Sequence, residues 1–409
     1  MVLPEQEVSA VYVSHTGMTE PLGHSQVLPY VEGLARHGFR MQIVAFEPER
    51  ATADEIRAVE ERLGTAGIGY LWSRRSPSEA LTAKLAEATR ALTRLLALAL
   101  RKRPRIVHAR SYLPAAAAHA AAAVSPGTRF LFDARGLLGE EYVDAGHWSA
   151  DSFRYRLLKR VERRLFARAD AVVVLTERHR RYLYDDACLV PRRTPIEVIP
   201  TCVDVLRFSP SADARVRWRR ELGVEERFVL VYAGTLGAWY REPEMIRFYA
   251  SLRRRRPARF ALFTHSPTDR FEAALARERV PRDELTVRRV APSEMPGALA
   301  AADAAISFIT PCFSKLGSSP TKTAEYLAMG LPTVLNRGIG DSDLLIDEVP
   351  AVIDAGDLSA EALEQAAVRL TTADVRGLRE SARHAAVERF SLENIGIPRY
   401  RQLYERLVR

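Results

Sequence analysis

Two lysines and a glutamate in the stretch 306–336 could bind an anionic ligand. Lys315 and Lys322 are two of only five lysines in a chain that is crowded with arginine. Lys322 falls in the first turn of a predicted helix, where the helix dipole disfavours a positive charge. Free backbone N–H groups, serine hydroxyls and ammonium groups would meet there, which favours a phosphate. Glu325, one turn further along the same face, could bind ribose hydroxyls, so the stretch suits a nucleotide.

A strand–helix–strand unit is predicted to position these side chains. An apolar run at 306–309 predicts a strand, and a polar loop rich in glycine and serine follows it at 311–318. Ser319 is predicted as the N-cap of the helix, and Gly330 is predicted to end it. A second strand at 333–335 would complete a right-handed parallel unit.

A purely structural interpretation of the helix is equally compatible with the residue chemistry. Lys322 and Glu325 would then form an ion pair on the solvated face of a well-capped helix. The residue types alone leave the nucleotide site and the surface ion pair open.

The segment S-S-P-T-K-x-x-E-Y-L-A-x-G-L-P-x-V resembles the nucleotide-sugar motif of retaining glycosyltransferases with the GT-B fold, the large family 4 group. This resemblance favours the nucleotide site. It implies that five residues of the segment and its loop bind the donor: Lys315, Ser318, Ser319, Lys322 and Glu325. The family usually has two glutamates eight positions apart. Glu325 matches the second, whereas Gly317 stands in place of the first.

Size and composition are those of an ordinary globular protein. The 409 residues are enough for two domains, with 47% hydrophobic and 27% charged residues. No apolar run is long enough to span a membrane, and the N-terminal segment lacks the pattern of a signal peptide. The three cysteines are scattered without metal-site spacing, so we expect a cytoplasmic protein without a bound metal.

The net charge of +9 favours anionic partners such as nucleotide sugars or anionic lipid surfaces. No nucleic-acid-binding module is present, and the basic residues are not interleaved with aromatic ones, so no nucleic acid is expected. The helix predicted at 151–168 is strongly basic and carries an apolar stripe that includes Phe153, Leu157 and Leu165. It either packs on a sheet with its charges outward or contacts an anionic membrane peripherally, on the inner face.

The first half of the chain opens with a strand at 8–14, a glycine-containing loop and a helix that Ser25 could cap and that runs to residue 37. The loop does not have the G-x-G-x-x-G pattern, which disfavours a dinucleotide site. The string L-G-H-S-Q-V-L-P-Y-V-E-G-L-A-x-x-G resembles the N-terminal glycine loop of the glycosyltransferase group. The resemblance implies that Gly17, Gly23 and His24 lie near the acceptor and the donor phosphates.

Polar residues follow two further predicted strands, at 106–110 and 130–134. Ligands bind at the carboxyl ends of strands in open parallel sheets, which makes Arg110 and Asp133 candidate catalytic residues. The family often has a histidine in the place of Arg110. D-A-R-G-x-x-x-E-E resembles a loop of the same group and adds Arg135 to the cleft residues.

The second half repeats this architecture, with a strand at 228–233 followed by G-T-L-G-A-W-Y-R. Family members commonly hold the diphosphate with an arginine and a lysine in this loop. Here Thr235 takes the arginine place and the loop has no lysine, so Arg241 is a candidate substitute. The resemblance also assigns to the donor Gly234, His265 and the backbone of Val290.

The fold implied is α/β, with two Rossmann-like doubly wound domains facing across a cleft. Residues 1–203 and a crossing helix at 390–409 would form the acceptor-side domain, and residues 204–389 the nucleotide-sugar-binding domain. The activity implied is retaining transfer of a sugar from a nucleotide-sugar donor to a carbohydrate or lipid-linked hydroxyl acceptor, in glycan or glycolipid synthesis. No cofactor is expected, because cationic groups and a helix N-terminus can neutralise the leaving diphosphate. An inactive nucleotide-sugar-binding accessory protein and a nucleotide-sugar epimerase stay open as alternatives.

Overall fold

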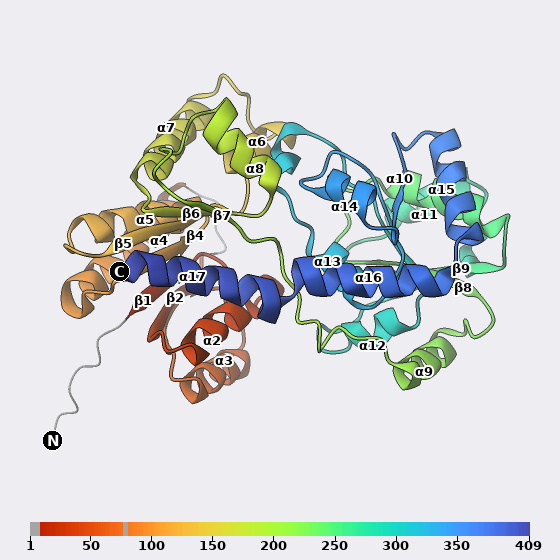
Figure 1. The fold of residues 1–409 in the computed structure, drawn as a ribbon, viewed down its shortest axis with the longest axis horizontal. Helices are drawn as coiled ribbons and strands as arrows, with labels where there is room; N and C mark the ends of the chain where they lie inside the picture. Colours follow the sequence, from red (N-terminus) through yellow and green to blue (C-terminus); the bar gives the residue numbers. More distant parts are fainter. Residues whose placement is uncertain (1–8, 77–80) are drawn as a thin grey trace. The chain divides into compact units, whose positions relative to one another are not determined.

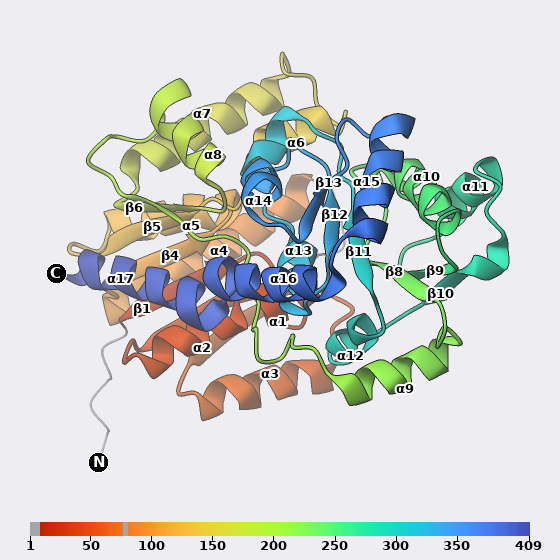
Figure 2. The same ribbon diagram turned by 45° about the vertical axis from the view of Figure 1, so that its right-hand side comes forward.

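The computed structural model describes residues 9–76 and 81–409 and divides into two compact units (Figure 1). Unit 1 comprises Met1–Pro200 and Leu392–Arg409, and unit 2 comprises Thr201–Ser391. Each unit has its own parallel sheet with helices on both faces, as Figure 2 shows from a second direction. The predicted α/β class with two doubly wound domains is therefore confirmed. Val8, at the start of the first predicted strand, lies outside the described residues.

The sheet of unit 1 has seven parallel strands. In spatial order these are β3 (Gly69–Arg74), β2 (Met41–Glu47), β1 (Ala10–Ser14), β4 (Ile106–Arg110), β5 (Arg129–Asp133), β6 (Ala171–Val174) and β7 (Ile196–Val198). Val11 and Val13 pack in the core beneath α4 (Leu81–Lys102), α5 (Tyr112–Ala123) and α7 (Phe153–Arg168). Tyr12 points to the opposite face, where α2 (Leu28–Arg36) and α17 (Ile397–Val408) pack.

The sheet of unit 2 has six parallel strands. In spatial order these are β10 (Leu285–Arg288), β9 (Ala258–Phe263), β8 (Phe228–Ala233), β11 (Ala304–Ser307), β12 (Thr333–Leu335) and β13 (Val352–Asp354). One core lies under four helices: α9 (Ala212–Leu222), α12 (Met295–Ala300), α13 (Thr321–Ala328) and α16 (Val375–Phe390). The other core lies under α10 (Glu242–Arg253), α11 (Asp269–Arg277) and α15 (Ala360–Thr372).

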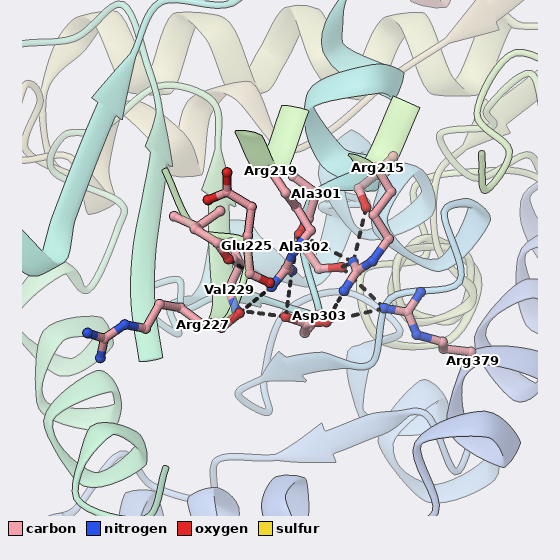
Figure 3. Close-up of polar contacts among 11 residues, drawn as sticks. Arg215, Arg219, Glu225, Arg227, Val229, Ala301, Ala302, Asp303 and Arg379 are labelled. Carbon is pink, nitrogen blue, oxygen red and sulfur yellow. Dashed lines mark hydrogen bonds and ion pairs between the residues drawn. The ribbon is translucent and has the colours of Figure 1, made fainter. Parts of the chain in front are cut away.

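Several arginines of unit 2 form ion pairs and hydrogen bonds within the fold. Figure 3 shows Arg215, Arg219 and Arg379 converging on Asp303, which directly precedes β11. The Asp303 carboxylate also accepts a hydrogen bond of 2.8 Å from the backbone N–H of Val229 at the start of β8. The first two arginines donate to carbonyl groups at the end of α12 as well. Part of the positive charge therefore stabilises the edge of the sheet at which β8 and β11 begin.

The prediction of a single helix capped by Ser25 and running to residue 37 is wrong. The chain forms two helices, α1 (Pro21–Gln26) and α2, separated at Val27, whose φ and ψ are −126° and −62°. Ser25 lies inside α1, and its hydroxyl donates to the carbonyl of Pro21. Pro29, in the first turn of α2, has no N–H group to continue an earlier helix, and proline favours a helix start.

Candidate functional site

The candidate donor residues lie at the carboxyl edge of the unit 2 sheet, where glycines shape the loop after β8. Gly234 and Gly237 have φ values of +130° and +139°, which side-chain-bearing residues rarely adopt. The backbone N–H of Gly234 donates to Phe263 at the end of β9. Tyr326 of α13 bonds to the backbone of Ala233 with its hydroxyl, which fixes α13 to the end of β8.

The start of α13 differs from the prediction. The N-cap is Pro320, with no side-chain cap, and the hydroxyl of Ser319 instead accepts a hydrogen bond from the backbone of Thr201. The Thr201 hydroxyl in turn donates to the Ser319 carbonyl at 2.6 Å. Thr201, which is distant in sequence, therefore binds the Ser319 hydroxyl that was predicted to cap α13. The N-terminal N–H groups of α13 consequently receive no side-chain acceptor, while Gly330 ends the helix at φ +67° as predicted.

Lys322 is buried, with 8% of its surface exposed. Its ammonium group donates to the Tyr232 hydroxyl at 2.6 Å and lies 4.0 Å from the ring centroids of both Tyr232 and Tyr240. Burial lowers the pKa of this amine to about 7, against the opposing charge of Glu325. A Cβ atom on Gly234 would lie 3.1 Å from Lys322 Nζ, so the glycine leaves room for the ammonium group.

Glu325 lies one turn along α13 and is partly buried. Within the described residues, no hydrogen bond or ion pair engages its carboxylate. Burial raises the pKa of this carboxyl to about 7, although Lys322 and Arg207 favour the charged form. The interpretation of Lys322 and Glu325 as a solvated surface ion pair is therefore wrong, because the lysine is buried and the two groups are not within ion-pair distance.

The other donor candidates differ in whether other groups of the protein already bind them. Lys315 is 7% exposed, and its ammonium group lies 3.7 Å from the ring centroid of Trp239. Arg241 forms an ion pair of 2.5 Å with Glu244, so its charge is largely neutralised. Thr235 is exposed, and its carbonyl accepts a hydrogen bond from the Tyr232 hydroxyl.

Three further donor candidates lie close to this edge. His265 Nε2 is 3.4 Å from the carbonyl oxygen of Val290, which brings these two predicted residues together. Ser318 follows the short 3-10 helix Phe313–Gly317, with its backbone N–H bonded to Lys315. Their roles toward a donor stay predictions.

The candidates of unit 1 form a buried charged network at the ends of β4 and β5. Asp133 is fully buried and accepts a hydrogen bond of 3.0 Å from Tyr400 on α17. Arg110 and Arg135 approach the same carboxylate at 3.7 and 3.8 Å. Burial alone would raise the pKa of Asp133, but Arg135, His108 and Arg110 outweigh it and lower the pKa. Asp133 would therefore be a weak base at neutral pH, and its contacts fix α17 to the sheet.

The glycine loop of unit 1 is organised by a carboxylate that the sequence analysis missed. Glu47, at the end of β2, is fully buried and accepts hydrogen bonds from the backbone N–H groups of Met18 and Thr19 and from the Tyr70 hydroxyl. A Cβ on Gly17 would lie 2.6 Å from Glu47 Oε2, and one on Gly23 would lie 2.1 Å from the carbonyl oxygen of Gly17. These amides already bind an internal anion. His24, in contrast, is exposed on α1.

Sequence reasoning also missed the aromatic residues around the lysines. Tyr232 is the fifth residue of an apolar strand, and Trp239 and Tyr240 end the glycine loop. The W-Y pair beside two glycines was the available signal, but no spacing rule connects it with Lys322, some 80 positions away. In the described part of the chain, no group of three or more histidine, cysteine, aspartate or glutamate residues could hold a metal ion.

The contact between Gly234 and Lys322 gives a paired stability test. Gly234→Ala and Gly237→Ala both place a side chain at a positive φ, which should cost about 1–3 kcal/mol each. The Cβ of the first meets Lys322, whereas that of the second has nothing within 4 Å. We expect Gly234→Ala to lower the free energy of unfolding, measured in urea, more than Gly237→Ala does. Equal losses would contradict the close approach of Lys322 to the loop.

The Asp133 network predicts a pH-dependent contribution to stability. Because the folded state lowers the pKa of Asp133, its stabilisation is present above the unfolded pKa and is lost as the pH falls through the folded pKa. Asp133→Asn should cost about 3–5 kcal/mol at pH 7, since it leaves buried arginines unpaired. The difference from the parent should shrink toward pH 3 in urea titrations. Tyr400→Phe, which removes one hydrogen bond, should cost about 1 kcal/mol. A pH-independent loss for Asp133→Asn would show that its charge does not matter.

Comparisons with known proteins agree with this arrangement. Residues 23–202 match the family described as glycosyl transferase 4-like domain. A glycosyltransferase from Rickettsia africae ESF-5 superposes with a TM-score of 0.73 at 14% identity, covering 98% of both chains. Sucrose-phosphate synthase from Thermosynechococcus elongatus gives 0.72 at 15% identity, covering 97% of this chain and 98% of that one.

The HepE protein of Anabaena, solved in complex with UDP-glucose, gives a TM-score of 0.69 at 14% identity, covering 97% of this chain and 99% of that one. No curated protein has a sequence that matches this chain significantly. The structural likenesses establish the fold, and the match over residues 23–202 establishes the family of the first unit. Residues 23–202 carry a glycosyl transferase 4-like domain, and the chain has the GT-B fold of these solved structures.

Proposed function

We propose that this protein is a glycosyltransferase that moves a sugar from a nucleotide-sugar donor to a hydroxyl acceptor with retention of configuration, in glycan or glycolipid synthesis. One observation carries the proposal. Lys322 and Glu325 bring a buried ammonium group and a carboxylate to the start of α13 without pairing with each other. Burying charged groups costs free energy unless a partner compensates, so this arrangement suits a ligand that carries an anion and hydroxyl groups.

The donor diphosphate would bind at Lys322, Lys315 and the uncapped N–H groups of α13. These cationic groups and the helix dipole would stabilise the charge that develops on the leaving diphosphate. No resident cofactor or metal is needed for this neutralisation. Glu325 would accept hydrogen bonds from the ribose hydroxyls. Because HepE was solved with UDP-glucose, UDP-sugars are the first donors to test, followed by GDP- and ADP-sugars.

The sugar itself would be held by neutral groups. Gly317 stands where the related enzymes have a glutamate, and it is buried at the end of the 3-10 helix. The Ser318 hydroxyl, which has no hydrogen-bond partner among the residues described, can contact sugar hydroxyls together with nearby backbone groups.

Transfer would proceed on one face of the sugar. The bond between the anomeric carbon and the diphosphate oxygen breaks as the bond to the acceptor oxygen forms on the same side. The departing phosphate oxygen accepts the proton of the acceptor hydroxyl, so no separate base is required. The low pKa of Asp133 and its bond to Tyr400 agree with a reaction that does not use this carboxylate as a base.

Variants of the two α13 residues test the donor site. Lys322→Ala should weaken binding of the best nucleoside diphosphate by about 1.5–3 kcal/mol, the value of a charge-assisted contact. Arg241→Ala is the matched control and should have little effect, because Glu244 already neutralises that arginine. Glu325→Gln should weaken binding of the ribonucleotide and leave the 2′-deoxy analogue almost unchanged. Isothermal titration calorimetry measures the affinity of the parent and of each variant.

Two outcomes would contradict the assignments. Equal affinity of the parent and Lys322→Ala would show that the diphosphate does not bind at α13. Equal losses of affinity for the ribonucleotide and the deoxyribonucleotide in Glu325→Gln would show that Glu325 does not bind the ribose. Turnover then distinguishes the alternatives. Product formed only with an acceptor supports the transferase, an altered sugar nucleotide formed without one indicates an epimerase, and donor binding without turnover indicates an accessory protein.

We also propose that α7 places the protein, in the cytoplasm, against an anionic membrane surface. The predicted apolar stripe is buried only in its second half, since Phe153 and Leu157 are 66% and 46% exposed. Among the described residues, none of six exposed arginines on this helix has an acidic partner: Arg154, Arg156, Arg160, Arg163, Arg164 and Arg168. None of the described helices is long and apolar enough to cross a bilayer.

A charge reversal tests this contact. Phe153, Leu157, Arg160 and Arg164 share one face of α7, because they are spaced by three or four residues. The double variant Arg160→Glu with Arg164→Glu should abolish sedimentation with vesicles of phosphatidylcholine and phosphatidylserine at low salt, since each basic residue contributes about 1 kcal/mol. The matched double variant Arg217→Glu with Arg220→Glu on α9 should still sediment. If the parent does not sediment with the vesicles at low salt, α7 has a purely structural role.

A further inference from the structure

The ammonium groups of Lys315 and Lys322 both rest on aromatic rings from one segment of unit 2. Lys322 Nζ lies 4.0 Å from the ring centroids of Tyr232 and Tyr240, whose rings meet edge to face at 5.7 Å. Lys315 Nζ lies 3.7 Å from the ring centroid of Trp239. An aromatic face attracts a cation through its negative quadrupole. We call Tyr232, Trp239 and Tyr240 the aromatic clamp.

The backbone holds the clamp in place. The N–H of Thr310 donates to the Trp239 carbonyl, and the N–H of Arg241 donates to Phe308, so the loop pairs with the chain leaving β11. Tyr240 forms an antiparallel bridge with Ile309. The Asn336 amide bonds to both the N–H and the carbonyl of Ile309, each at 2.9 Å. The rings therefore have a fixed support, whereas the lysine side chains have several rotatable bonds.

Tyr232 and Tyr240 hold the charge of Lys322 without neutralising it. Among the residues described, no carboxylate lies within ion-pair distance of Lys322, in contrast to Arg241, which Glu244 binds at 2.5 Å. A carboxylate would compete with a phosphate for the ammonium group. An aromatic face is a weaker partner, and a doubly charged diphosphate can displace it because charge-assisted hydrogen bonds are stronger.

We propose that Tyr232, Trp239 and Tyr240 are positioning residues, which hold the ammonium groups of Lys315 and Lys322 in place for the diphosphate of the donor. This inference rests on the proposed function. Thr235 and Tyr240, in the loop after β8, carry no charge and cannot themselves neutralise a phosphate. The clamp instead orders the two lysines. The lysines reach the diphosphate by small changes in their terminal torsions while their alkyl chains stay packed.

The test compares conservative and non-conservative variants of the two partly exposed clamp residues. Tyr240→Phe keeps the ring and should bind UDP within about twofold of the parent. Tyr240→Leu and Trp239→Leu remove a ring and should each weaken UDP binding by about 5- to 20-fold, that is about 1–1.8 kcal/mol at 1.4 kcal/mol per tenfold change. Uridine, which has no phosphate, serves as the internal control and should bind all variants equally. If UDP is not the preferred diphosphate, GDP or ADP and its nucleoside replace it.

The outcomes separate this inference from the function on which it rests. Equal losses of UDP and uridine in Tyr240→Leu would show a general disturbance of the site and overturn the positioning role. UDP binding to Tyr240→Leu at parental strength would overturn it as well, while leaving the donor site intact. A parent that binds none of the three diphosphates would overturn the proposed function and the clamp together. A loss in Tyr240→Leu that Tyr240→Phe restores would support the clamp.

Discussion

The ammonium group of Lys322 is buried at the start of α13, where the helix dipole also opposes a positive charge. Burial lowers its pKa to about 7, and the compensation comes from one phenol oxygen and two aromatic faces. The surrounding structure is arranged to permit this. Gly234 has no side chain where Nζ lies, and Tyr326 fixes the helix to the end of β8. An unpaired buried cation of this kind is costly to stability and is therefore a good indicator of a site for an anion.

Three carboxylates that are buried or partly buried, in contrast, are bound by groups of the protein itself. Asp303 is surrounded by three arginines and a backbone N–H group, and Asp133 by two arginines and Tyr400. Glu47 binds the backbone of the glycine loop in unit 1. In each case these protein groups stabilise the carboxylate and fix a loop, a strand end or a helix contact. This contrast is the reason for proposing Lys322 and Glu325 as residues that bind a ligand.

The sequence predicted β4, β8 and β12 with the bounds that the structure has, because short apolar runs that end in polar or glycine-containing loops are typical of parallel sheets. The strand predicted at 306–309 lies two residues too far along the chain, since β11 is Ala304–Ser307. The sequence also located α13, and residue chemistry together with the resemblance made Lys322 and Glu325 candidates for the donor site. It could not predict that Ser319 bonds to Thr201 instead of capping α13, because that partner is 118 residues away in the chain. The aromatic clamp was not predicted for the same reason. Its contacts join β8 to α13, and helix or strand periodicity carries no information about such pairs.

The most direct test of the account uses the scarcity of lysine in this chain. With lysine labelled by ¹³C at the ε-carbon, the spectrum contains one signal for each of the five lysines, and Lys159→Arg, Lys315→Arg and Lys322→Arg assign three of them. Aromatic rings should shift the signals of Lys315 and Lys322 in the free protein. On titration with the best-binding nucleoside diphosphate, we expect the signals of Lys315 and Lys322 to move and the signal of Lys159, which Glu140 and Glu162 bind in unit 1, to stay unchanged. Saturable binding that leaves the Lys322 signal in place would contradict the assignment of the donor diphosphate to the start of α13.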